Sequence, residues 1–429
     1  MQNSENEGLV RGIRRWDLVA LTINGIIGAG IFGLPAKVYA LIGTYSLLAF
    51  VACAVVVILI ILCFAEVSSR FEDTGGPYIY ARAAFGQGVA FEIGWLIWLA
   101  RLTAFGANCN LLVNYLTYFW PAASQPGFRA AIIVAVVTVL AVINLVGIRQ
   151  AAIVSNIFTI GKLIPILIFI AVGLFFLNRS AFAFGPPPGS GAFSQSVLLL
   201  VYAFTGFEMA TIPAGEVKNP QKNLPYALLI AIAVVGVFYI LIQIVCVGTL
   251  PELAQSQKPL ADAGVRFLGV LGGTIISAGA IISITGNLNI LMLSGSRVPF
   301  AMAEQKQLPS VIGRVHSSFS TPYIAIVITA IVMLVLTLRS SFVQALTISA
   351  IARLVTYGAT CLALPILRRA EGSPALFKLP LGNIVPGLSL VLIVWLLAHS
   401  TLQEATTATI AATVGLLIFF SYRAYSTRS

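Results

Sequence analysis

Two apolar segments of the chain are interrupted in the middle by glycine and proline residues. The first interruption lies in residues 24–35 and the second in residues 202–213. Glycine and proline release backbone N–H and C=O groups from helical hydrogen bonds, and hydrocarbon cannot satisfy these groups. Each interruption must therefore face protein or a watery cavity. Because the two occupy corresponding places in the two halves of the chain, they predict a substrate site near the middle of a membrane.

The composition identifies a membrane protein. Of the 429 residues, 59% are hydrophobic and only 9% are charged, and the mean hydropathy is +0.98. Soluble domains do not have such values. At about 20 residues per crossing, the chain accommodates about twelve transmembrane helices without a separate aqueous domain. The apolar run that begins at Leu18 continues past Pro35 without a cleavage-type site, so we expect a retained first helix and not a signal peptide.

The apolar runs form two sets of five, separated by a proline-rich loop at residues 185–189, with two runs after them. The expected helices are residues 18–41, 47–67, 91–120, 130–146 and 151–177, then 197–214, 224–250, 269–293, 323–338 and 342–366, and finally 384–397 and 405–422. Because five is odd, the second set enters the membrane from the opposite side, as in the inverted repeats of secondary transporters. We expect an N-terminal tail at 1–12, repeats within 13–178 and 194–369, and two helices outside the repeat within 384–423.

Basic residues indicate the orientation, because cytoplasmic loops retain Lys and Arg. The expected outer loops hold the smaller group, which is Lys37, Arg129, Arg179, Lys258, Arg266 and Arg339. The expected inner loops hold the larger group, which is Arg11, Arg14, Arg15, Arg70, Arg82, Arg149, Lys218, Lys222, Arg297, Lys306, Arg314, Arg368, Arg369, Lys378, Arg423 and Arg428. We therefore expect a multi-pass protein of the cell (inner) membrane with both termini cytoplasmic.

Several classes of partner are not expected. The net charge of +11 is scattered over loops without a contiguous basic patch, which argues against nucleic-acid binding. All five cysteines fall inside apolar stretches without paired spacing in a loop, so we expect no disulfide, no metal site and no other cofactor. The sequence leaves the oligomeric state open.

The first interruption has the chemistry of a site for a zwitterion. Gly28, Ala29 and Gly30 place three small residues where the chain must unwind. Backbone amides at the start of the following half-helix form a site for a carboxylate, and the carbonyl groups of the broken ends accept from an ammonium group. Small residues also allow close packing of helices in membranes. The matching interruption in the second half favours the binding site.

Three groups of residues together resemble a known transporter family. They are GAGIF at 28–32, FAE at 64–66 with GGPY at 75–78, and GFE at 206–208 with EVKNP at 216–220. The chain resembles bacterial amino acid permeases of the amino acid, polyamine and organocation transporter superfamily along nearly its whole length. This resemblance implies the leucine-transporter fold, in which helices 1 and 6 are discontinuous, and an amino acid as substrate.

The resemblance also implies roles for individual residues. The amides of Ala29 and Gly30 would hold the carboxylate of the substrate. The amine would contact the carbonyl groups of Ile26, Tyr202 and Thr205. Two aromatic residues, Phe204 and Phe207, would flank this pocket, with Phe204 as the aromatic gate.

Four charged residues lie inside expected helices: Arg101, Lys162, Glu208 and Arg353. A charge at mid-membrane costs about 2.5 to 3.5 kcal/mol on insertion scales, so each needs a functional or pairing reason. In related transporters a lysine at the position of Lys162 reaches the first helix where sodium sits in sodium-driven members. The resemblance thus implies an ammonium group in place of the ion, and sodium-independent transport coupled to protons or to exchange. The alternative is a lysine that extends to the inner interface.

The other three buried charges have open interpretations. Glu208 directly follows the second interruption, where it could take part in proton coupling or serve as a fixed partner of Arg101, Arg353 or Lys162. Arg101 and Arg353 could pair with an acidic residue or recognise the substrate. Further polar candidates for the pocket wall are Asn108, Asn110, Ser283, Thr285, Asn287, Thr347 and Ser349.

Two other classes of function remain as alternatives to a transporter. A membrane-embedded enzyme would need clustered catalytic side chains, whereas His316 and His399 lie in a loop and near a helix end. A channel would need a filter or a ring of carboxylates, which no segment suggests. No phosphate-binding Gly-x-x-x-x-Gly-Lys-Ser/Thr loop is present, which argues against ATP-driven pumping.

Overall fold

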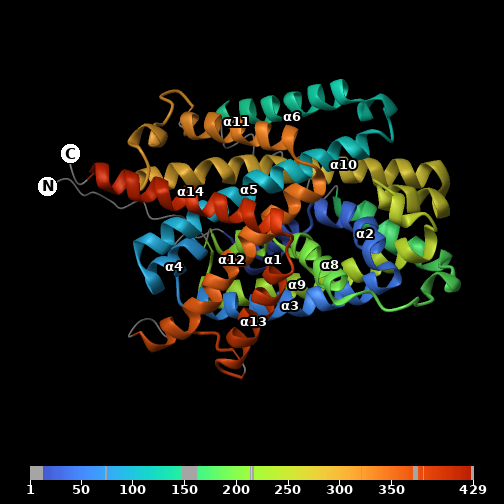
Figure 1. Cartoon of the computed structure of the whole chain (residues 1–429), viewed down its shortest axis with the longest axis horizontal. Coiled ribbons are helices and arrows are strands. Elements are labelled where there is room, and N and C mark those ends of the chain that lie inside the picture. Colours follow the sequence, from blue (N-terminus) through green and yellow to red (C-terminus); the bar gives the residue numbers. More distant parts are fainter. Residues whose placement is uncertain are drawn as a thin grey trace.

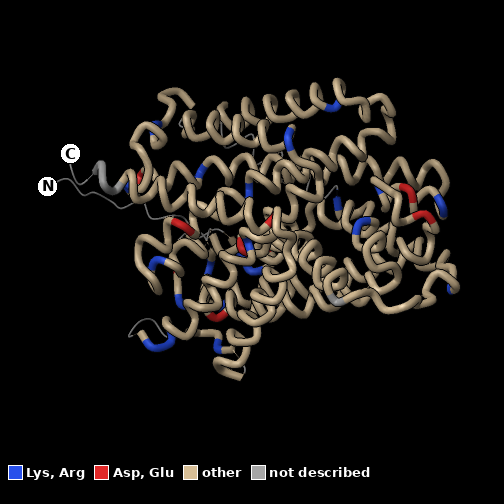
Figure 2. The backbone as a smooth tube through the Cα atoms, viewed as in Figure 1, with Lys and Arg blue, Asp and Glu red and all other residues tan. Residues whose placement is uncertain are grey.

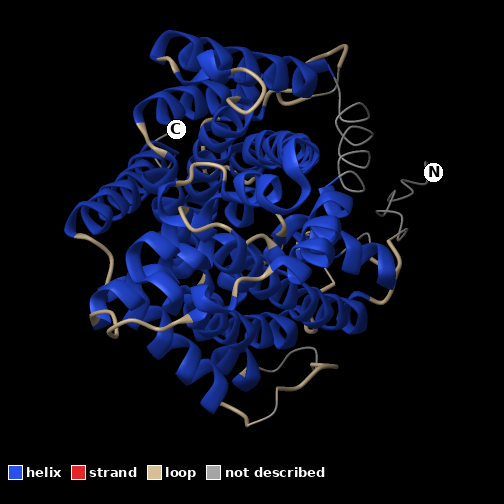
Figure 3. Ribbon diagram, turned by 90° about the vertical axis from the view of Figure 1, so that its right-hand side faces the viewer, coloured by secondary structure: helices blue, strands red, loops and turns tan. Residues whose placement is uncertain are grey.

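The computed structural model describes residues 13–72, 75–146, 162–212, 214, 217–319, 321–370, 375–379 and 381–426. In these residues the chain is helical and contains no strand beyond an isolated bridge between Ile13 and Val217 (Figure 3). The helices are α1 (Arg15–Ile26), α2 (Ala29–Ile42), α3 (Ser46–Ser68), α4 (Pro77–Phe85), α5 (Gln87–Leu116), α6 (Pro126–Val146), α8 (Ser190–Phe204), α9 (Pro220–Thr249), α10 (Pro259–Glu304), α11 (Tyr323–Arg339), α12 (Phe342–Arg369), α13 (Ile384–Ala398) and α14 (Leu402–Ser426).

Length and apolar character suit these helices to a membrane. Eight described segments are long and apolar enough to cross a bilayer, and three shorter apolar helices, including Lys162–Phe176, accompany them. Several leucine, isoleucine and phenylalanine side chains on α14 face outward; Leu417 and Phe420 are each 61% exposed. In a bilayer such side chains contact lipid tails. The expectation of an all-helical membrane protein agrees with this structure.

Two elements differ from the sequence expectation. The short helix α4 was not expected, because a count of long apolar runs does not register a nine-residue helix that begins at Pro77. Helix α10 extends beyond the expected 269–293 at both ends and bends at Gly269, which has a φ of 63°. The residues before the bend fold back, so that Gly264 lies close to Gly272.

The interrupted helices lie inside the bundle. Helix α1 packs mainly against α9, and α2 packs mainly against α8. Helix α5 packs against both α10 and α12. Helices α6 and α11 pair at one edge of the molecule (Figure 1). Charged residues are spread thinly along the chain (Figure 2). This arrangement surrounds both interruptions with protein.

Candidate functional site

Both expected interruptions are present in the structure. Helix α1 ends at Ile26 and α2 begins at Ala29, with the two residues between them in extended conformations. Helix α8 ends at Phe204, and a short 3₁₀ helix, η5 (Phe207–Thr211), follows. The two interruptions touch each other, because a Cβ atom on Gly206 would lie 2.2 Å from the Gly25 carbonyl oxygen. Gly206 also has a φ of 109°, so glycine is needed there for both reasons.

The Lys162 side chain binds carbonyl groups at the C-terminal end of α1. Its Nζ atom donates to the carbonyl oxygens of Asn24 at 2.7 Å and Ile27 at 2.8 Å. The side chain is 3% exposed. These carbonyl groups belong to the last turn of α1 and to the interruption, where the helix dipole favours a positive charge. The contact with the first helix that the resemblance implies is therefore present, and the side chain does not extend to an interface.

Glu208 closes the second interruption. Its carboxylate accepts from the Gly206 N–H at 3.0 Å and from the Tyr357 hydroxyl at 2.7 Å, and it forms an ion pair with Arg353. Of the partners left open by the sequence, the structure selects Arg353. Arg101 lies nearby and donates to the Met209 sulfur at 3.3 Å. The carboxylate thus joins η5 to α12.

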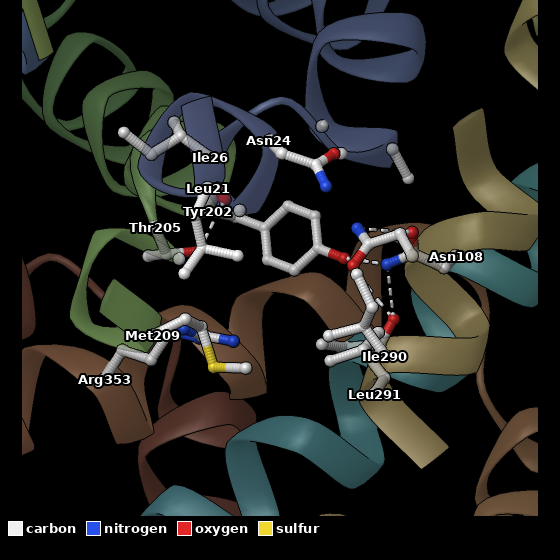
Figure 4. A pocket seen from close by; sticks show the side chains of 17 residues that line it. Leu21, Asn24, Ile26, Asn108, Tyr202, Thr205, Met209, Ile290, Leu291 and Arg353 are labelled. Atoms are coloured by element: carbon white, nitrogen blue, oxygen red, sulfur yellow. Dashed lines mark hydrogen bonds between the residues drawn. The ribbon is translucent and has the colours of Figure 1, made fainter. Parts of the chain in front are cut away.

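A cavity of about 230 Å³ lies between the interruptions (Figure 4). The Tyr202 ring lies across it, and its hydroxyl accepts from the Asn108 amide at 2.6 Å. Asn287 in turn donates to the Asn108 side-chain oxygen at 3.2 Å. The wall is formed by Leu21, Asn24, Gly25, Ile26, Gly28, Ala29, Gly30, Ala104, Asn108, Tyr202, Thr205, Gly206, Met209, Asn287, Ile290, Leu291 and Arg353.

All five of the expected backbone ligands line this cavity. Helix α2 begins here, and the first N–H groups of a helix have no partner within it. The carbonyl oxygens of Ile26 and Tyr202 already accept hydrogen bonds, from the Tyr239 and Thr205 hydroxyls respectively. A carbonyl oxygen has two lone pairs, so the Ile26 oxygen retains capacity for a second donor, whereas the Tyr202 oxygen also accepts from the Thr205 N–H at 3.4 Å. The expected residues that line the cavity are Ile26, Gly28, Ala29, Gly30, Tyr202 and Thr205.

The two expected aromatic neighbours lie elsewhere. Phe204 and Phe207 are fully buried and do not line the cavity. Phe204 packs edge-on against Tyr239, and Phe207 packs against Phe64 and Tyr357. In this conformation Tyr202 is the aromatic side chain in contact with the cavity. The expected placement of Phe204 beside the pocket differs because the helix ends there and turns its side chain toward α9.

Several cavity residues were not expected from the sequence. Ala104, Ile290 and Leu291 stand four, three and four positions from the expected Asn108 and Asn287, so helical periodicity would have indicated them. Met209 gave no such signal, because the rotation of η5 after the interruption is set by packing. Of the other polar candidates, Asn110 lines a different cavity, and Ser349 donates to Ala100 O.

Another expected motif supports the bundle. Glu66 forms ion pairs with Arg70 and Arg368 and accepts from the Leu379 N–H, so it ties α3 to α12 and to the segment before α13. Parts of the expected features lie outside the described residues. These are the tail at 1–12, residues 147–161 with Arg149, and Pro213 and Glu216 after the second interruption.

The comparison with known families decides the identity of this architecture. The model of the amino acid permease family matches residues 13–420. The chain belongs to the amino acid permease family. The expected superfamily is thus confirmed, and the chain is a secondary transporter and not an enzyme, as expected.

Curated relatives cover nearly the whole chain. The serine/threonine exchanger SteT of Bacillus subtilis (strain 168) is 30% identical over 96% of this chain and 96% of its own length. A methylthioribose transporter of the same organism is 29% identical over 98% and 95%. The branched-chain amino acid permease BcaP, also from that organism, is 27% identical over 98% and 94%.

Proposed function

We propose that this permease carries a neutral amino acid by alternating access, with the substrate held in the central cavity between the two interruptions. The observation that supports this most strongly is the meeting of both breaks at one cavity. The first amides of α2, at Ala29 and Gly30, would bind the carboxylate. The carbonyl groups of Ile26, Tyr202 and Thr205 would accept from the amine. The proposal includes the leucine-transporter fold with about twelve spans and a five-plus-five repeat.

The charge balance of the wall supports a neutral substrate. Of the described residues that line the cavity, only Arg353 is charged, and its positive charge is compensated by the carboxylate of Glu208. Leu21, Ile290 and Leu291 give the remaining wall an apolar character. The names of two relatives, a serine/threonine exchanger and a branched-chain permease, fit this class. Because another relative is a methylthioribose transporter, the uptake assay must also include methylthioribose.

The proposed coupling is sodium-independent. The Lys162 ammonium group supplies a positive charge beside α1, hydrogen-bonded to the carbonyl oxygens of Asn24 and Ile27. Exchange and proton symport are both compatible with this arrangement. A Lys162 side chain that changes protonation during the cycle would couple transport to pH.

Uptake into proteoliposomes tests the proposal. Labelled serine, threonine, leucine, valine, arginine, glutamate and methylthioribose would be compared, with sodium replaced by choline in a parallel series. We expect saturable uptake of neutral amino acids that persists in choline. Counterflow into preloaded vesicles separates exchange from symport, and a proton ionophore reports proton coupling. Uptake of methylthioribose alone would overturn the assigned substrate class, and collapse in choline would overturn sodium independence.

A further inference from the structure

A second cavity, which we call the outer cavity, lies beside the second half of α2, where Lys37 lines it. Its volume is about 580 Å³. The basic-residue distribution places it on the external side of the membrane. Three cationic side chains, Lys37, Arg129 and Arg339, contribute to its wall, and the described residues that line it include no Asp or Glu.

Neutral oxygens hold two of these cations. The Arg129 guanidinium group donates to the side-chain oxygens of Asn114 at 2.9 Å and Asn110 at 2.7 Å. The Lys37 ammonium group donates to the Gln257 side-chain oxygen at 3.1 Å. Among the ion pairs found in the described part of the chain, none includes Lys37, Arg129 or Arg339. The positive charge of this wall is therefore not compensated by a carboxylate there.

The beginning of α12 adds to the positive potential. This helix has 28 residues, its N-cap is Ser341, and its first residues belong to the wall of the outer cavity. The N-terminal end of a helix carries a partial positive charge. Side-chain cations and a helix terminus together make the cavity suitable for an anion. A bound anion would reduce the like-charge repulsion among the three cations.

The outer and central cavities both border helices α2 and α5. Gly30 and Asn108 line the central cavity, whereas Lys37 and Asn110 line the outer one on the same helices, α2 and α5. The seven-residue separation on α2 corresponds to about 10 Å. Phe342 lines the outer cavity and packs against the part of α2 between Gly30 and Lys37, because its ring would lie 2.7 Å from a Cβ atom on Gly33.

We propose that the outer cavity is a carboxylate-binding site, which receives the α-carboxylate of an amino acid before the substrate enters the central cavity. This ligand assignment rests on the proposed function. The absence of an acidic partner for the amine from the described wall makes this a weak, transient site. Its function is to raise the local concentration of substrate at the entrance, as clefts of one charge do.

Charge removal tests the site by transport. In right-side-out proteoliposomes, Lys37→Gln/Arg339→Gln should raise the external apparent KM about tenfold while the maximal rate and the internal KM stay unchanged. Lys37→Arg/Arg339→Lys should restore it. The matched control is Arg179→Gln/Arg266→Gln, which removes two charges from the same expected side without touching the outer cavity. An external KM equal to that of the control would overturn the proposal.

Thermal unfolding tests the site without transport. Acetate should raise the Tm of the wild type relative to acetamide, and this shift should vanish in Lys37→Gln/Arg339→Gln but persist in the control variant. Stabilisation by phosphatidylglycerol and not by acetate would overturn the carboxylate assignment in favour of a lipid headgroup. If the wild type carried no amino acid, the proposed function would fail, while the acetate shift would still decide whether the outer cavity binds carboxylates.

Discussion

At the scale of single residues, Gly28 and Gly30 of the first interruption have different surroundings. A Cβ atom on Gly28 would lie 2.3 Å from the amide nitrogen of Asn287, at the end of a flexible side chain. A Cβ atom on Gly30 would lie 2.6 Å from the backbone Cα of Ala203 in α8. A bulky residue at position 30 therefore disturbs helix packing as well as the approach to the amides, so Gly28 is the cleaner position to test.

We expect Gly28→Ala to raise the apparent KM for substrate about tenfold, a loss of about 1.4 kcal/mol. Gly28 has extended backbone angles that alanine also adopts, so the cause would be displacement of Asn287 from its hydrogen bond to Asn108. Uptake kinetics and Tm together check this. Gly30→Val should instead lower the Tm, whereas Gly127→Ala, at a position without close neighbours, should change neither. Normal uptake by Gly28→Ala would argue against the assigned site.

Lys162 is expected to be essential for the transport cycle. Lys162→Ala removes the donor that holds Asn24 O and Ile27 O, so we expect uptake to fall at least about tenfold, as for loss of a charged hydrogen-bond partner of about 1.5 to 3 kcal/mol. Lys218→Ala, at an exposed position, is the control. Initial rates across pH, together with substrate binding to the purified protein, provide the measurement. Full activity with an unchanged pH profile would leave Lys162 without a coupling role.

At the scale of elements, the sequence predicts where helices break better than what holds the breaks. Gly28 and Gly206 mark the interruptions because glycine and its neighbours interrupt a helix through local chemistry alone. The choice of Arg353 over Arg101 as the partner of Glu208 depends on how α12 and α5 pack, which no local pattern encodes. The direction of the Phe204 side chain, toward Tyr239 of α9, could not be predicted for the same reason.

The link between η5 and α12 should behave as a coupled pair. Glu208→Gln leaves the Arg353 charge buried without its partner, and Arg353→Met does the converse, so each should destabilise by about 3 to 5 kcal/mol. Glu208→Gln/Arg353→Met should cost less than the sum. A double-mutant cycle, measured by reversible denaturation in mild detergent micelles, checks this. Strict additivity would show that the two side chains do not stabilise the fold as a pair.

At the scale of the whole molecule, orientation in the membrane sets which cavity faces which solution. The outer cavity lies on the side that holds few basic residues, and the expected inner side carries most of them. Helix α1 passes from the expected inner side to the central cavity, so the assignment of both cavities depends on this orientation. The five native cysteines offer a clean background for testing it, because all of them are buried.

Single exposed cysteines should therefore report the two sides. Gln255→Cys follows α9 at the expected external end, and Lys222→Cys lies in the first turn of α9 at the expected cytoplasmic end; both positions are exposed. A membrane-impermeant maleimide added to right-side-out vesicles should label Gln255→Cys at once and Lys222→Cys only after lysis, because the reagent does not cross the bilayer. The unmodified chain, with its buried cysteines, measures the background. The reverse labelling pattern would invert the orientation, and the outer cavity would then open to the cytoplasm, where it could not receive substrate arriving from outside.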